Sequence, residues 1–99
     1  MSVHTFAAPL WVHHGEGGWH FLSVPPDVGA DIADRTAGSR RDFGSVRVAA
    51  TVGATSWRTS IFPDAASGSF LLPVKRTVRK AEGLETGDVV RVELEVDPP

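Results

Sequence analysis

The sequence predicts a mainly β fold, a small barrel of about six strands with two short helices, in one domain over residues 1–99. From residue 90 to residue 96 every second side chain is Val or Leu, and the three between them are charged. A period of two is typical of a strand with one buried and one exposed face. Ten glycines and seven prolines interrupt the chain often, as a barrel of short strands requires.

The first quarter of the chain is expected to form a hairpin. Residues 3–12 favour a strand, in which Pro9 indicates an edge position or a bulge. The glycine-rich residues 13–18 are expected to form the loop to a second strand, residues 19–24. That second strand carries bulky side chains on both faces, so we expect it to have a neighbour on each side.

The middle of the chain predicts a short helix, a loop and a second hairpin. Residues 25–36 begin with two prolines and an aspartate, which suit the first helical turn and the positive end of the helix dipole. Gly29 weakens this helix, so we expect it to be short. Residues 36–44 are polar and contain glycine, as expected of an exposed loop. Residues 45–52 and 55–62 alternate again around a tight turn and predict two paired strands.

The last third predicts a strand, a basic helix of two turns and the long alternating strand. Val74, Val78 and Ala81 lie on one arc of the helix, where Leu84 covers them. Gly83 provides the helix end, because a residue without Cβ enters the left-handed region at little cost. The opposite side of the helix carries four basic residues, Lys75, Arg76, Arg79 and Lys80.

Composition and hydropathy exclude several classes of protein. The chain contains no cysteine, which excludes disulfides, zinc–thiolate sites and cysteine nucleophiles. It has neither a signal-peptide pattern nor an apolar run of about eighteen residues, so we expect a soluble cytoplasmic protein without membrane contacts. The net charge of −2 provides no overall attraction to nucleic acid.

The four histidines are not spaced as metal ligands. His13 and His14 are adjacent and would point to opposite faces of a strand, and His20 would approach only one of them across the hairpin. The chain has no G-x-S-x-G nucleophile motif. The glycines of residues 15–18 lie between two strands rather than before a helix, where a phosphate would bind. We therefore expect no metal, no cofactor and no catalytic residue.

Several separate blocks, spread from Phe6 to Val96, carry a resemblance to a known family. They are Leu10-Trp11, Gly17-Gly18-Trp19-His20-Phe21, Val24-Pro25, Trp57-Arg58-Thr59-Ser60-Ile61-Phe62-Pro63, Leu72-Pro73-Val74-Lys75, Val78-Arg79-Lys80-Ala81-Glu82-Gly83-Leu84 and Gly87-Asp88. Together they resemble the DUF1905 family of uncharacterised bacterial and archaeal domains. The resemblance implies a double-split β-barrel capped by short helices, similar to the swapped-hairpin AbrB-like proteins, which include dimeric DNA-binding regulators. It implies no activity, so function has to be argued from the site.

Three tryptophans are more than the core of a small barrel readily absorbs. A tryptophan at the mouth of the barrel beside a cation would give a cavity with an apolar wall and a cationic end, which suits a small aromatic or acyl anion. We therefore expect a non-catalytic module that binds a small ligand or a protein. The candidate ligand-binding residues are Trp19, His20, Trp57, Arg58, Ser60, Lys75 and Arg79.

Two other functions use the same basic helix. In the first, an AbrB-like regulator binds nucleic acid, although the net negative charge disfavours it; its contacts would be Lys75, Arg76, Arg79 and Lys80. In the second, a small enzyme uses His20 as acid–base group and Arg79 as oxyanion partner, but no third residue orients the imidazole. A fourth explanation is purely structural: the helix lies against the acidic residues 85–97 and the charges compensate. Both a monomer and a homodimer are compatible with the sequence.

Arg79 is expected to lie beside the opening of the barrel. Val78 has to face the core, and the 100° step of a helix then places Arg79 on the helix flank. In a structural role its guanidinium would pair with a carboxylate such as that of Glu93 or Asp88. In a functional role it would face an open cavity with no protein carboxylate nearby.

Overall fold

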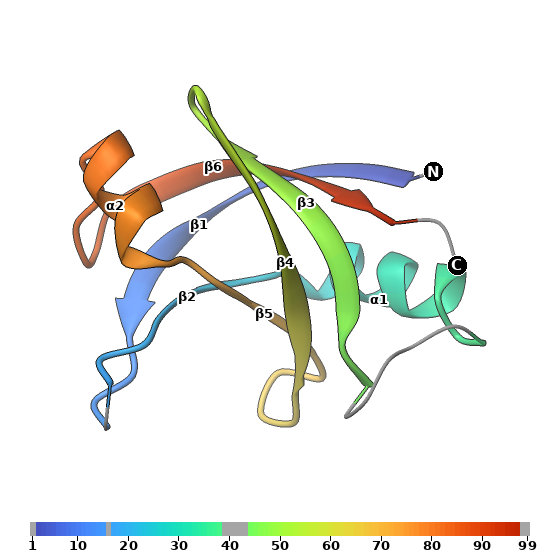
Figure 1. Cartoon of the computed structure of the whole chain (residues 1–99). Coiled ribbons are helices and arrows are strands. Elements are labelled where there is room, and N and C mark those ends of the chain that lie inside the picture. Colours follow the sequence, from blue (N-terminus) through green and yellow to red (C-terminus); the bar gives the residue numbers. More distant parts are fainter. Residues whose placement is uncertain (1, 16, 39–43, 98–99) are drawn as a thin grey trace.

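Six antiparallel strands close into a barrel, in the order β1-β2-β5-β4-β3-β6, with β6 paired to β1 (Figure 1). The structure is a computed structural model that describes residues 2–15, 17–38 and 44–97. In chain order its elements are β1 (Ser2–Val12), β2 (His20–Ser23), α1 (Pro26–Arg35), β3 (Val46–Val52), β4 (Thr55–Asp64), β5 (Ser69–Pro73), α2 (Arg76–Glu82) and β6 (Val89–Val96). The predicted mainly β barrel with two short helices is confirmed.

Strand β1 changes partner along its length. It pairs with β6 from Ser2↔Val96 to Pro9↔Val89, and from Leu10 onward it pairs with β2. The expected edge position of Pro9 is local: it pairs with β6 on one side, and the pairing with β2 on the other side begins only at Leu10. Pro9 is the last residue paired with β6, at the point where the strand passes to its next partner, and there its missing N–H disturbs the ladder least.

The alternation of the strands fills the interior of the barrel. On β6, Val90, Val92, Leu94 and Val96 are buried while Arg91 and Glu93 are exposed, as the sequence predicts. The other strands contribute the same kind of side chain, and those of Leu22, Val48, Ala50, Ile61 and Leu72 are wholly buried. This interior is a packed core, so a ligand site has to lie outside it.

Helix α1 packs closely on β5, and Gly29 permits the contact. A Cβ at Gly29 would lie 1.9 Å from Ser69 Oγ, whose hydroxyl donates to the Val24 carbonyl at 2.8 Å. The glycine is therefore a packing requirement, and the helix is short as expected, from Pro26 to Arg35. Of the loop expected at 36–44, residues 39–43 lie outside the described residues.

Helix α2 lies over the side of the barrel next to β4. Gly83 ends it in the left-handed conformation at φ 63°, and the Leu84 amide donates to the Arg79 carbonyl at 2.9 Å. The expectation that Ala81 faces inward is wrong, since Ala81 is exposed. Val78 and Glu82, four residues apart, form the inner face instead, and Glu82 Oε2 accepts a hydrogen bond from Thr55 Oγ1 at 2.6 Å.

Candidate ligand-binding site

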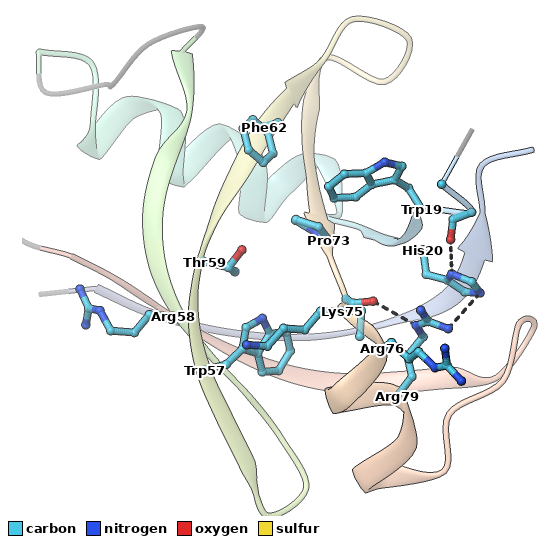
Figure 2. Close-up of a pocket in the computed structure, with 13 residues that line it drawn as sticks. Trp19, His20, Trp57, Arg58, Thr59, Phe62, Pro73, Lys75, Arg76 and Arg79 are labelled. Carbon is cyan, nitrogen blue, oxygen red and sulfur yellow. Dashed lines mark hydrogen bonds between the residues drawn. The ribbon is translucent and has the colours of Figure 1, made fainter. Parts of the chain in front are cut away.

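A cavity of about 470 Å³ opens on the outside of the barrel, between β2, β4 and the start of α2 (Figure 2). It collects six of the seven residues that the sequence singles out as ligand-binding: Trp19, His20, Trp57, Arg58, Lys75 and Arg79. The remaining described lining residues are Gly17, Gly18, Thr59, Phe62, Pro73, Val74 and Arg76. Segments that are distant in the sequence therefore meet at one hollow.

Ser60, the seventh residue, is not among the described residues that line the cavity. Arg47 of β3 lies directly opposite Ser60 of β4 in the sheet register. Arg47 Nη1 donates to Ser60 Oγ at 3.3 Å, so the Ser60 hydroxyl forms a hydrogen bond between β3 and β4. Its neighbour Thr59 lines the cavity in its place.

Arg79 is half-buried at the end of the cavity formed by α2. Its Nε donates to the Val74 carbonyl at 3.1 Å, and its Nη1 lies 3.5 Å from His20 Nε2; Figure 2 shows both contacts as dashed lines. Within the described residues Arg79 forms no ion pair. The pairing with Glu93 or Asp88 that a structural role would require is therefore absent, and Asp88 Oδ2 accepts the Glu85 amide instead.

His20 is held in one orientation by the hairpin loop. Its Nδ1 lies 2.7 Å from the Gly18 carbonyl oxygen, which only accepts, so Nδ1 is the donor in this contact. The other ring nitrogen, Nε2, faces the Arg79 guanidinium. Gly17 and Gly18 adopt φ values of 85° and 55°, which favour glycine, and the loop thereby places both Trp19 and His20 at the rim.

Positive charge dominates the lining. None of the described lining residues is Asp or Glu. Arg58 is neutralised by a close contact of its Nη2 with Asp97 Oδ2. Lys75 and Arg76 are exposed and form no ion pair with the described residues, so the charge compensation by residues 85–97 expected from the structural explanation is not seen there. Three cations at one end of the cavity, Lys75, Arg76 and Arg79, thus have no counter-ion within the described part of the chain.

The tryptophans have three different roles. Trp11 Nε1 donates to Ser23 Oγ at 2.9 Å, away from the cavity. Trp57 is 8 % exposed and forms a wall of the cavity. The Trp57 Nε1–H has no hydrogen-bond partner among the described residues. Every buried side-chain nitrogen or oxygen of those residues does have a partner. This N–H therefore lies at the accessible surface. Trp19 is 57 % exposed and stacks on Phe21 at 6.2 Å and 11°.

Sequence reasoning missed Phe62 and Pro73 as lining residues. Phe62 lies on the polar face of β4, with Arg58 and Ser60, and is 43 % exposed. The alternation of β4 predicts a polar side chain at this position. The large apolar side chain found there was the feature of the sequence that could have identified Phe62 as a lining residue. Pro73 lies opposite Phe21 in the register of β5 and β2, a contact that the sequence does not encode locally.

Lys80 lies apart from the cavity. It lines a shallower hollow of about 290 Å³ on the other side of α2, together with Arg76, Arg79 and Glu85. Of the four basic residues proposed for nucleic acid, Arg76 and Arg79 line both hollows, Lys75 lines only the cavity and Lys80 lines only the second hollow. The described residues contain no group of three His, Asp or Glu side chains that could hold a metal ion, and no helix described here is long and apolar enough to cross a membrane.

Comparison with known proteins identifies the family. A model described as a domain of unknown function, DUF1905, matches residues 6–94, which extend from β1 into β6. A comparison with curated proteins finds no match. The family match includes the hairpin loop, β4 and α2, which together form the cavity. Since it covers nearly the whole chain, the resemblance is confirmed, and this protein belongs to the DUF1905 family.

Proposed function

We propose that this domain binds a small organic anion in the cavity between β2, β4 and α2, without catalysing a reaction on it. The observation that carries the proposal is the half-buried guanidinium of Arg79, which has no ion pair within the described residues. Partial burial of a cation without a counter-ion is unfavourable. A carboxylate or phosphate would complete the site, because the planar guanidinium matches both in a bidentate geometry.

The composition of the lining supports an organic anion. Lys75 and Arg76 add positive charge at the same end, while Trp57, Phe62 and Pro73 form apolar walls. An inorganic ion would leave these walls in water, whereas a ligand with a carbon body would cover them. A volume of about 470 Å³ is within the range typical of small-molecule sites.

The arrangement of His20 supports binding rather than catalysis. Its Nδ1 donates to a backbone carbonyl, that of Gly18, and its Nε2 accepts from Arg79. Both ring nitrogens are therefore engaged in fixing the direction of the guanidinium. A general base would need its free nitrogen aimed at a reacting proton, and in this structure that nitrogen faces a cation.

An NMR titration tests the proposal. Benzoate and butyrate are added to ¹⁵N-labelled protein, and the Trp57 Nε1–H and Arg79 Nε–H signals are followed. We expect saturable shifts of both signals, and loss of at least tenfold in affinity in Arg79→Gln. Arg91→Gln is the matched control, because Arg91 is exposed on β6 and outside the cavity. Equal affinities of the two variants, or no saturable shift with either probe, would overturn the proposal.

A second candidate function, nucleic-acid binding, is favoured by the exposed cations of α2, which form no ion pair in the described chain. Four phosphate contacts would give a log–log salt slope of about −3.6 on duplex DNA. Because the net charge is −2, we expect affinity no tighter than roughly tens of micromolar at physiological salt. Fluorescence anisotropy of a labelled duplex at several salt concentrations measures both; a nanomolar, sequence-specific complex would reverse the ranking of the two functions.

A further inference from the structure

An apolar groove of about 280 Å³ adjoins the cavity on the outer face of the barrel. Three residues, Trp19, Phe62 and Pro73, line both hollows, so the two share a boundary. Figure 2 shows these three side chains at one end of the cavity and Arg76 and Arg79 at the other. The groove is completed by His13, Phe21 and Leu71.

The groove crosses three neighbouring strands. Phe21 of β2 lies opposite Pro73 of β5, and Leu71 of β5 lies opposite Phe62 of β4, so the apolar side chains form a continuous stripe. The outer face of an antiparallel sheet is normally polar. Trp19 and Phe62 are nevertheless 57 % and 43 % exposed. Contiguous exposed apolar surface of this kind marks an interaction site.

Charge changes sharply along this surface. Lys75, Arg76 and Arg79 lie at the α2 end of the cavity, whereas His13 is the one titratable residue among the described lining of the groove. A compact aromatic acid would fill the cavity and leave the groove in water. A ligand with an anionic head and a longer apolar chain would cover both hollows at once.

The closed barrel favours such an amphiphile over a peptide. A bound peptide usually pairs its backbone with the free edge of a sheet. Strand β4 pairs with β5 only over Phe62–Asp64, so its free edge lies beside the cavity. At the groove itself Phe21 and Leu71 each pair with a strand on both sides, so no backbone edge is available there. The backbone amides of a peptide lying on the groove would remain without partners, at a cost in free energy. An acyl chain has no such groups.

We propose that the ligand of this site is an acyl carboxylate, a fatty-acid-like anion whose carboxylate binds Arg79 and whose chain crosses Trp19, Pro73 and Phe62 into the groove. This inference rests on the function proposed above and specifies its ligand class. Each methylene of the chain that the protein buries should improve affinity by about two- to fourfold. The gain should stop once the chain extends past the groove.

A series of straight-chain carboxylates tests the inference. Acetate, butyrate, hexanoate, octanoate and decanoate are titrated below their micelle concentrations, with dissociation constants from isothermal calorimetry and NMR. We expect affinity to rise stepwise with chain length and then level off, with the Trp19 Nε1–H signal responding only to the longer members. Octan-1-ol should bind at least tenfold more weakly than octanoate, because it lacks the charge that Arg79 recognises.

Two variants assign the chain effect to the groove. Phe62→Ser should flatten the dependence of affinity on chain length, because Phe62 lies at the boundary between the two hollows that a long chain has to cross. Val89→Ser is the matched control, because Val89 is 73 % exposed on β6 and lines neither hollow. An unchanged chain-length dependence in Phe62→Ser would overturn the inference.

The outcomes separate the two proposals. If butyrate binds at Arg79 but octanoate binds no tighter, the acyl-chain inference fails and the anion-binding function stands. If octanoate binds equally well to the wild type and to Arg79→Gln, both fail, because the chain then binds without recognition of the anion. A stepwise gain that is lost in Phe62→Ser and a uniform loss in Arg79→Gln would support both.

Discussion

The two short helices of this domain differ in how their charges are balanced. In α1, Arg35 Nε donates to Asp31 Oδ2 one turn earlier at 2.8 Å, and Nε2 of His4 on β1 lies 3.6 Å from the same oxygen. The helix also packs tightly against the barrel, where Gly29 approaches Ser69. Asp31 and Arg35 of α1 therefore find partners within the domain.

In and just before α2 the cations form no ion pair within the described residues. Lys75 and Arg79, and Arg76 and Lys80, are four residues apart, and like charges at this spacing cost roughly 0.2–0.5 kcal/mol per pair. The one acidic side chain of the helix, Glu82, turns to Thr55 instead. The difference indicates that α1 stabilises the barrel, whereas the cations of α2 are available to bind a ligand or another molecule.

The largest effect is expected at the buried face of α1. Ile32→Ala should lower the free energy of unfolding by about 2–5 kcal/mol, because Ile32 is wholly buried between the helix and the barrel. Urea unfolding followed by tryptophan fluorescence measures this change. Asp34→Asn, at an exposed position of the same helix, should stay within about 0.5 kcal/mol of the wild type. Equal effects of the two variants would show that α1 does not anchor the core.

Gly29→Ala should come next, with a loss of about 1–3 kcal/mol from overpacking against Ser69. Helix propensity alone predicts the opposite sign, a gain of about 1 kcal/mol, so the sign of the change in urea unfolding is decisive. Gly38→Ala is the control, since a Cβ there meets no atom within 4 Å. A stabilised Gly29→Ala would contradict the close packing of α1 on β5.

The attachment of α2 depends on one hydrogen bond that can be isolated. Glu82→Ala and Thr55→Val should each cost about 1 kcal/mol, because each removes the contact of 2.6 Å between Thr55 Oγ1 and Glu82 Oε2. The double variant should cost clearly less than the sum of the two. Additive losses in the unfolding free energies would mean that this contact does not couple α2 to the hairpin of β3 and β4.

The smallest effects test the charge difference itself, and they should have opposite signs. Lys80→Gln should raise the free energy of unfolding by roughly 0.2–0.5 kcal/mol, because it removes repulsion from Arg76. Asp31→Asn should lower it by roughly 0.2–1 kcal/mol, because Arg35 loses its partner. Thermal unfolding at low salt resolves such changes, and both should shrink at high salt. A destabilised Lys80→Gln would show that a carboxylate compensates Lys80 in solution.

The sequence predicted features that depend on local periodicity. Alternation alone determines which side chains of β6 face the core, and the observed burial of Val90, Val92 and Leu94 follows it. The position of Arg79 was also predictable, because Val78 has to face inward and the helical step then fixes its neighbour. In both cases the inward direction of one apolar side chain fixes the directions of its neighbours in the same strand or helix.

The features that the sequence could not predict depend on contacts between distant strands. Nothing in the sequence shows that Arg47 lies opposite Ser60, or that Thr59 rather than Ser60 lines the cavity. The close approach of Gly29 to Ser69 could not be predicted, because Ser69 is forty residues further along the chain. Ala81 was predicted to face inward only because its side chain is apolar. The inner contact is made instead by Glu82, with Thr55 of β4. Such pairings arise only once the barrel is closed.

The pairing of β1 with β6 has a consequence for the order of folding. The first strand finds its longest ladder, from Ser2↔Val96 to Pro9↔Val89, with the last strand of the domain. During synthesis the apolar residues Phe6 and Ala8 therefore remain exposed to solvent until β6 has left the ribosome and pairs with β1. Loop closure over such a separation is slow compared with local hairpin formation. The hairpin of β3 and β4 can form early, and the meeting of the two outermost segments becomes the late, rate-determining step of folding.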